Sequence, residues 1–384
     1  MEIAHASIDM AKVQAFQHPI VDFPIGFRGG PVLLSPELQK FRHHRHDEPF
    51  DHVRNVLSYP HHLDGEYIYA GPIFGHFGHF MSEMIHRIVP ARALKLPGKF
   101  LFVLGEDDES HMDIDRVSQR VPEVLEFLGI GRSNSVFVNR NTTVAKLHLV
   151  QQGAHLNSAP KPGYTDVLRA YSGPKLDALF GATRRPPRLY VSRSRLPRAG
   201  GILGESYLDK ALIDQGFTIF HPEEHPFAVQ MDHYRKADVV IFAEGSACHG
   251  TELLGSGMMK QTILIPRSFQ ARILRKPLEA RSVAYVTADV SRYLGSLQIN
   301  PNNGLPMLSR GVSVLKPRRV TKVMMEAGIP IRRSFSAWAY RACAIKDMRT
   351  YLAEMRGGNG WNAAGALRLV RSILTGGLHW TIKP

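Results

Sequence analysis

The stretch from Asp238 to Gly257 constrains the fold of this chain more strongly than any other part of the sequence. Its apolar run over residues 239–242, VVIF, consists of β-branched and aromatic side chains that are typical of a buried strand. The run stops at a turn of small residues, Glu244–Ala247, and helical spacing follows. A strand that leads into a helix is typical of α/β proteins, and the free backbone N–H groups at such a turn attract anions. We therefore expect a parallel sheet with a candidate anion site at this turn.

A chain of 384 residues is longer than one hydrophobic core usually supports, so two domains are expected. The composition shifts to Arg and Pro between Gly181 and Pro187, which is typical of a domain boundary. We predict an N-terminal α/β domain over residues 1–182, a second, Rossmann-like domain over residues 183–330, and a basic helical tail over residues 331–384. The tail is expected to pack back on the first domain.

The formal net charge of +14 indicates an anionic partner. From Ile331 to the C-terminus there are nine Lys and Arg residues against two acidic ones, so the tail carries half of the excess. A second cluster has no acidic residue between its members: Arg184, Arg185, Arg188, Arg193, Arg195 and Arg198. The sequence contains no zinc finger, basic-region heptad or aromatic RNA-binding signature, so nucleic acid is not an expected partner. Phosphorylated sugar donors, acidic glycans and an anionic membrane face remain as alternatives.

Two cysteines, Cys248 and Cys343, lie far apart in the sequence and match neither a disulfide framework nor a metal-binding spacing, which favours a reducing compartment. The first twenty residues lack the apolar core of a secretory signal, and no apolar run is long enough to span a bilayer. The sequence therefore predicts a cytoplasmic protein. Its basic tail is expected either to pack on the protein or to make peripheral contact with the inner face of an anionic membrane.

In the first domain, alternating strand and helix signals indicate a mainly parallel sheet covered on both faces. A glycine-rich turn leads into a predicted helix whose apolar face comprises Phe80, Met84, Ile88 and Ala91. His79 and Glu83 lie on a neighbouring stripe of this helix. His79 is interpreted either as a polar residue that bonds a nearby loop or as a general base, because imidazole titrates near neutral pH. A metal-binding face of His79, Glu83 and His86 is a third alternative.

Two further motifs are weak candidates for metal binding. The histidine-rich run over residues 41–47 contains two arginines that would repel a cation, so we expect a solvated loop there. The triplet Asp113-Ile114-Asp115 resembles metal-binding D-x-D motifs, but it lies among other acidic residues and is more typical of a solvated surface. We therefore expect no metal and no cofactor.

In the second domain, strands are predicted near residues 189–192, 217–220, 239–242, 262–265 and 283–287, with helices between most of them. This alternation predicts a doubly wound sheet, whose ligands bind at the carboxyl ends of the strands. Arg193 and Arg195 follow the first of these strands, and Glu244–Ala247 follow the third. We therefore expect the two arginines and the turn to face the same crevice.

Several segments resemble, in the same order, motifs of glycosyltransferase family 61, the group with the DUF563 domain that includes capsular polysaccharide biosynthesis proteins. Gly78-His79-Phe80 with Glu83 resembles the motif G-H-[FW]-x-x-E, and Leu189–Arg193 resembles the strand I-Y-I-S-R. Ile202–Glu205 resembles I-x-N-E. A series G-F…Q…A-x-V-I-x-x-H-G-A is matched by Gly216-Phe217, Gln230, Ala237–Ile241 and Glu244–Ala247.

The resemblance implies two Rossmann-like domains that face each other across a cleft, the GT-B arrangement. It also implies metal-independent transfer of a sugar, with inversion at the anomeric carbon, from a nucleotide sugar to a glycan or glycolipid acceptor in cell-surface polysaccharide biosynthesis. His79 is then the candidate base, and Glu83 either orients it or acts in its place. The candidate donor-binding residues are Arg193, Arg195, Gly245, Ser246 and Ala247 around the diphosphate, Glu244 on a ribose or sugar hydroxyl, and His249 on a phosphate or as a helix cap.

Two positions depart from the family pattern. Glu244 stands where the family commonly has His, and Gly204 stands where it commonly has Asn. These departures leave open a noncatalytic protein of the same fold that holds an acidic glycan and binds no nucleotide sugar. A metal-dependent enzyme that uses the histidines of the first ninety residues is a further alternative, and it requires stoichiometric metal.

Overall fold

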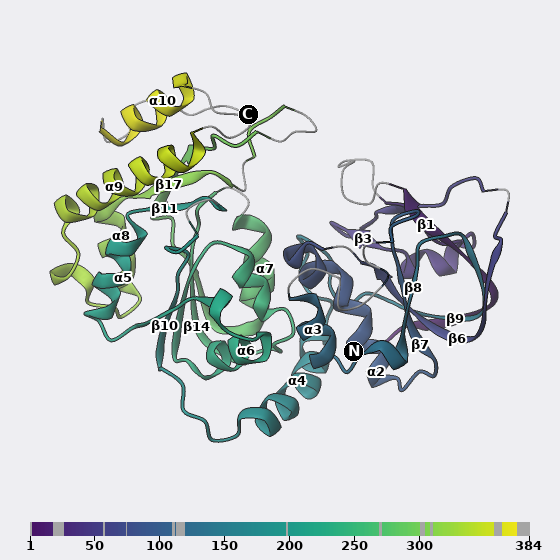
Figure 1. Cartoon of the computed structure of the whole chain (residues 1–384). Helices are drawn as coiled ribbons and strands as arrows, with labels where there is room; N and C mark the ends of the chain where they lie inside the picture. Colours follow the sequence, from purple (N-terminus) through teal and green to yellow (C-terminus); the bar gives the residue numbers. More distant parts are fainter. Residues whose placement is uncertain are drawn as a thin grey trace.

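The computed structural model of the chain describes residues 2–17, 27–56, 58–73, 75–109, 112, 120–196, 199–268, 271–299, 304–307, 310–356 and 363–374. These residues form a mixed α/β structure with two main sheets, one in each half of the chain (Figure 1). The first sheet has seven strands and the second has five. Among the described residues, every helix is too short or too polar to cross a lipid bilayer.

The first sheet is strongly curled and, as expected, mainly parallel: among its described strands four pairings are parallel and two are antiparallel. Its strands, in spatial order, are β5 (Asp51–His52), β2 (Phe27–Pro31), β1 (His5–Gln17), β9 (Thr142–Val150), β6 (His61–Pro72), β7 (Lys99–Val103) and β8 (Ser135–Val138). The long strand β1 runs antiparallel to β9, while β9, β6, β7 and β8 are mutually parallel. The end of β1 also meets the end of β7, because the Phe16 N–H donates to the Leu104 carbonyl at 2.9 Å. This bond draws the sheet toward closure on itself.

The second sheet is entirely parallel and doubly wound. Its order is β12 (Thr218–Phe220), β10 (Arg188–Val191), β13 (Val239–Ala243), β14 (Met259–Ile265) and β15 (Ser282–Thr287), and these strands match the predicted ones. Alternate residues enter two separate cores: Val240 and Phe242 point to one face, and Ile241 and Ala243 to the other. Helices α6 (Phe227–Lys236) and α7 (Arg272–Arg281) cover the first face, and α5 (Glu205–Ile213) and α8 (Pro317–Glu326) cover the second.

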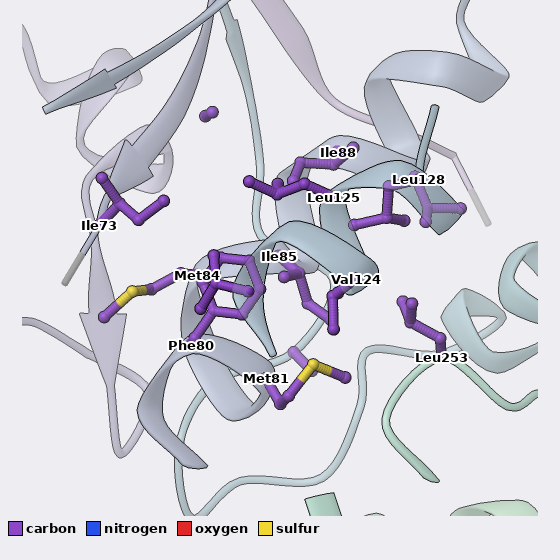
Figure 2. Close-up of a cluster of buried hydrophobic side chains, with 14 of the residues drawn as sticks. Ile73, Phe80, Met81, Met84, Ile85, Ile88, Val124, Leu125, Leu128 and Leu253 are labelled. Carbon is purple, nitrogen blue, oxygen red and sulfur yellow. The ribbon is translucent and has the colours of Figure 1, made fainter. Parts of the chain in front are cut away.

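The predicted helix after the glycine-rich turn is present but irregular. It consists of α1 (Phe77–His79), a π-helical turn η2 (Phe80–Met84), a 3₁₀ turn η3 (Ile85–Arg87) and α2 (Ile88–Ala93). The predicted apolar residues Phe80, Met84, Ile88 and Ala91 are all buried. Figure 2 shows Phe80, Met84 and Ile88 in one cluster with residues of α3 (Val121–Phe127) and with Leu253 of the second half. A π turn inserts an extra residue, and such turns are frequent at functional sites.

One hydrophobic core joins the two halves of the chain. The buried hydrophobic cluster that packs on the first sheet continues through α3 and α4 (Tyr164–Phe180) to α6. There it includes residues on the face of the parallel sheet that α6 and α7 cover. The rings of Phe127 and Phe227 meet edge to face at 6.1 Å, and the Phe227 N–H donates to Glu123 at 2.7 Å. The remaining short elements are β3 (His44–Arg45), β4 (Glu48–Pro49), η1 (Pro36–Phe41), η5 (Arg132–Asn134) and η7 (Pro222–Glu224).

The prediction that the C-terminal tail packs on the first domain is wrong. After η11 (Ile331–Arg333), helices α9 (Ala337–Met355) and α10 (Ala363–Leu374) lie over a small sheet of β11 (Gly201–Leu203), β17 (Val312–Leu315) and β16 (Ser291–Gly295), as Figure 1 shows. The Tyr340 hydroxyl donates to the Leu203 carbonyl at 2.7 Å. The inner face of α9 is buried in the second core, which contains residues from position 190 onward, so this face finds its apolar partners in the second half.

Candidate functional site

Arg193 and Gly245 lie against each other at the carboxyl ends of two adjacent parallel strands. Arg193 follows β10, Gly245 follows β13, and the strand order of the sheet reverses between these two strands. A Cβ atom placed on Gly245 would lie only 2.3 Å from Nη1 of Arg193, so the guanidinium covers the glycine backbone. Ligands of doubly wound sheets bind at this reversal of strand order. The two predicted neighbours are therefore together at the edge of the sheet where its ligand is expected to bind.

Glu205, the acidic residue of the segment Ile202–Glu205, fixes the position of Arg193. Its Oε1 accepts hydrogen bonds from the backbone N–H of Arg193 at 2.7 Å and from the Tyr190 hydroxyl at 2.9 Å. The carboxyl is buried, and this burial raises its pKa to about 7. Above that pH the carboxylate holds the Arg193 backbone through a charge-assisted bond.

A second arginine, Arg267, lies beside Arg193. It follows β14, the next strand of the sheet, and its Nη1 donates to the Gly311 carbonyl at 2.9 Å. Burial and then the charge of Arg193 lower the pKa of Arg267. The buried guanidinium of Arg267 and the half-buried one of Arg193 repel each other, so a bound anion would stabilise this site.

Glu244 supports the loop that carries Arg267. Its Oε2 accepts from the backbone N–H groups of Arg267 at 2.5 Å and Ser268 at 2.6 Å, and its Oε1 accepts from the Ser268 hydroxyl at 2.7 Å. The carboxylate is thus engaged within the protein, between the ends of β13 and β14. A His at this position would offer neither two acceptor oxygens nor their charge.

The regular helix predicted after Ala247 is absent. The segment is the six-residue 3₁₀ helix η8 (Ser246–Thr251), and residues 252–258 that follow it form turns and irregular backbone. Two glycines fit this segment to its neighbours, because a Cβ atom on Gly250 would lie 3.3 Å from the Tyr234 ring and one on Gly255 would lie 2.5 Å from the backbone of Arg169. Since so short a helix has no substantial macrodipole, the turn offers backbone N–H groups rather than a helix-terminus field.

His79 forms a short hydrogen bond with Glu83. Nδ1 of His79 lies 2.5 Å from Oε1 of Glu83, and the imidazole is 36% exposed while the carboxylate is completely buried. His79 and Glu83 are four residues apart, and the π turn places both side chains on the same side of the helical segment. His79 is therefore a partly accessible histidine held by a buried carboxylate, as a general base requires.

Glu83 is itself held by two residues of the histidine-rich run. Arg45 donates Nε at 2.5 Å and Nη2 at 2.9 Å to the two carboxylate oxygens, and His43 Nε2 lies 2.9 Å from Oε2. Burial alone would raise the pKa of Glu83, but the hydrogen bonds from His43 and His79 and the charge of Arg45 hold it well below the usual value. The prediction of a solvated loop here is wrong, because His43 and Arg45 are buried against Glu83.

Three histidines gather around Gly78. A Cβ atom on Gly78 would lie 3.2 Å from the ring of His76 and 3.4 Å from the ring of His249, and the rings of His76 and His79 are 4.8 Å apart. His249 belongs to η8, which begins directly after Gly245. The helix η8 therefore connects the histidines to the arginine site.

A second buried carboxylate, Glu252, orients His249. Nδ1 of His249 lies 3.4 Å from Oε1 of Glu252, and the buried Arg281 donates to Oε2 at 2.8 Å. Burial would raise the pKa of Glu252, but the charge of Arg281 and the bond from His249 hold it at about 2. Each half of the chain thus contributes one histidine held by one buried glutamate.

The other predicted positions take different roles. The guanidinium of Arg195 is paired with Glu224 on the exposed surface. His86 is buried against the hydroxyl of Tyr164, 3.0 Å away, so it forms no metal face with His79 and Glu83. Within the described ranges, no group of three or more His, Cys, Asp or Glu side chains is arranged to hold a metal ion. The triplet Asp113-Ile114-Asp115 lies outside these ranges.

Sequence reasoning missed four residues of this region. Arg267 follows a predicted strand by two positions, so the rule that identified Arg193 could have identified it as well. Glu252 lies three residues after His249, a spacing that places both on one side of a helical turn. The run that contains His43 and Arg45 was noted, but its contact with Glu83 gave no sequence signal, because the two residues lie 40 and 38 positions from Glu83.

Comparison with known protein families matches residues 77–264, about half of the chain, to the model of Glycosyltransferase 61. The matched range contains His79, Glu83, Arg193 and the segment from Glu244 to Glu252. Arg45 and Arg267 lie outside it. No curated protein matches the chain.

Proposed function

Because this chain belongs to glycosyltransferase family 61, we propose that it transfers a sugar from a nucleotide sugar to a glycan or glycolipid acceptor in cell-surface polysaccharide biosynthesis. The family supports a sugar donor and an acceptor in general terms. The observation that carries the finer proposal is the contact of Arg193 with Gly245, with Arg267 beside it, at the reversal of strand order in the parallel sheet. No metal or cofactor is part of the proposal.

The arginine site receives the diphosphate of the donor. Arg193 and Arg267 supply permanently charged, planar donors, and the backbone N–H groups of Gly245, Ser246 and Ala247 lie at the same turn. Charge develops on the diphosphate oxygen as the bond to the sugar breaks, so fixed donors at that place lower the barrier. His249, held by Glu252, lies in η8, four residues after Gly245, and is a second candidate contact for the phosphate.

His79 takes the proton of the acceptor hydroxyl. A carboxylate only accepts hydrogen bonds, so the bond to Glu83 keeps a proton on Nδ1 of His79 and the basic lone pair on Nε2. The acceptor oxygen attacks the anomeric carbon opposite the diphosphate, its proton passes to Nε2, and the nucleoside diphosphate leaves with the bonding electrons. This single displacement inverts the anomeric carbon. Glu83 is a positioning residue here, because it is buried and ion-paired to Arg45.

A second candidate function is noncatalytic binding of an acidic glycan. It is favoured by Glu244, which stands where the family commonly has His and is engaged with Arg267 and Ser268. A glycan holder has no use for a diphosphate site, so nucleotide binding separates the two functions.

Calorimetric titration with nucleoside diphosphates tests the proposed donor site. We expect Arg193→Ala to weaken binding by about 10- to 100-fold, as the loss of a charge-assisted contact predicts. Gly245→Ala should weaken it by about tenfold, because its methyl group displaces the flexible Arg193 side chain. Gly173→Ala is the matched control, since a Cβ atom there meets no neighbour within 4 Å. If no nucleoside diphosphate binds the unaltered protein, the glycan-holding function is supported instead.

A further inference from the structure

The outer face of the C-terminal helices carries one sign of charge. Six cationic side chains of α9, its C-cap and α10 are exposed: Arg341, Lys346, Arg349, Arg356, Arg368 and Arg371. In Figure 1, α9 and α10 form the outermost layer over the small sheet. We propose that this face docks on an anionic membrane surface. The proposal is independent of the proposed function.

The acidic residues of the same helices are turned away from this face. Asp347 is partly buried, and its carboxylate accepts a hydrogen bond from the backbone N–H of Gly204 at 2.7 Å. Glu354 is also partly buried. From Ile331 to the C-terminus these are the two acids of the sequence, so every fully exposed charged side chain described on α9 and α10 is cationic. Such a face is attracted to anionic headgroups, and each Lys or Arg near the surface adds to the attraction.

Large apolar side chains are exposed beside these cations. Trp338 on α9 is 82% exposed and Leu367 on α10 is 69% exposed. Trp338, Lys346, Arg349 and Arg356 are separated by eight, three and seven residues, so they lie on one side of α9. Indole rings prefer the headgroup region of a bilayer, where the ring is partly buried and its N–H stays hydrated.

This combination distinguishes a membrane from a soluble polyanion. A helix that lies in the plane of a bilayer has cations on its polar side and Trp or Leu inserted at the acyl boundary. An acidic glycan needs neither the indole nor the leucine, and both would remain exposed beside it. The charge pattern and the exposed apolar side chains therefore agree on a lipid surface.

Sedimentation with vesicles tests the proposal on the full-length chain. We expect binding to vesicles of phosphatidylglycerol and phosphatidylcholine, no binding to phosphatidylcholine alone, and a fall in binding as salt rises. The double variant Lys346→Glu with Arg349→Glu should bind at least about tenfold more weakly. Trp338→Ala should bind more weakly and lose salt-resistant retention.

The matched control is Arg28→Glu with Lys99→Glu, which changes the net charge equally on exposed positions of the first sheet. It should bind within about twofold of the unaltered protein, and circular dichroism confirms that each variant is folded. Equal weakening by both double variants would show attraction by net charge alone and overturn the proposal. Failure to bind anionic vesicles while a soluble polyuronate is retained would overturn it in favour of a glycan surface.

Discussion

Two buried carboxylates hold two of the three histidines around Gly78. Glu83 binds His79 and is neutralised by Arg45, and Glu252 binds His249 and is neutralised by Arg281. A buried ion pair is strongly destabilising when one partner is removed, because the other charge remains uncompensated. These glutamates therefore matter for stability as well as for the orientation of the histidines.

Glu252→Gln should give a stability loss that depends on pH. Burial raises the pKa of Glu252, but the charge of Arg281 and the hydrogen bond from His249, together with the nearby imidazoles, outweigh it and lower the pKa from 4.5 to about 2 on folding. A carboxyl group whose pKa is lowered on folding stabilises the protein at pH values above its pKa in the unfolded state. This contribution is lost as the pH falls toward its pKa in the folded state. At pH 7 the contribution is roughly 3 kcal/mol.

Urea unfolding at pH 7 and at pH 3 measures this contribution. The difference in unfolding free energy between the unaltered protein and Glu252→Gln should shrink markedly at pH 3. Lys260→Gln serves as the control, since its surface ion pair with Asp238 is exposed and should change stability little at either pH. A difference that stays constant between the two pH values would contradict the assigned role of Glu252.

At the residue scale, the sequence predicted contacts that follow from strand order and missed contacts that depend on distant loops. The proximity of Arg193 and Gly245 was predictable, because residues that follow neighbouring parallel strands emerge at the same edge of a sheet. The contact of Arg45 with Glu83 was not, because it depends on how a weakly periodic segment folds over the π turn. The histidine-rich run over residues 41–47, which contains Arg45, was predicted to be solvated, because charged residues without a known partner usually are.

At the scale of elements, apolar periodicity identified where segments are buried but not which helix type they form. Phe80, Met84, Ile88 and Ala91 are buried as their spacing predicted, yet the segment changes from α to π to 3₁₀. Every residue from Phe80 to Ala91 is buried, so packing on all sides decides the backbone there rather than one apolar stripe. The prediction of a regular helix after Ala247 is wrong, because Gly250 and Gly255 are packed directly against Tyr234 and Arg169.

Restoring the family's common Asn at position 204 should destabilise the protein. Gly204 has φ of 80°, and a Cβ atom there would lie 2.6 Å from the ring of Tyr340 on α9. Asn tolerates this left-handed backbone, so the expected cost comes from the clash and is about 1–3 kcal/mol. Thermal unfolding measures it, with Gly328→Asn as control, because its φ is 77° and nothing lies within 4 Å. A Gly204→Asn variant as stable as the control would show that α9 is not packed on β11 as described.

At the scale of the whole molecule, the two halves share one hydrophobic core. Residues of both sheets belong to it, and α3 packs on α6 through Phe127 and Phe227. The sequence indicated the change of sheet near residues 181–187, but it gave no sign of this shared core, because the contacts join segments about one hundred residues apart. The C-terminal tail was misplaced for the same reason.

A shared core predicts that the halves unfold together. Scanning calorimetry should show a single cooperative transition for the unaltered protein. Phe227→Ala should lower its stability by about 3–5 kcal/mol and leave one transition, because the lost contacts belong to both halves. Two separate transitions, with the midpoint temperature of only one of them lowered by Phe227→Ala, would contradict a common core.

The most direct test of the central claim is the turnover of His79→Ala. With the nucleotide sugar that the unaltered protein consumes, release of nucleoside diphosphate in the presence of acceptor should fall by about 10²- to 10⁴-fold, the usual range for loss of a general base. Donor affinity should be nearly unchanged, and His62→Ala on the exposed surface should retain full activity. Near-normal turnover of the folded His79→Ala protein would contradict the account.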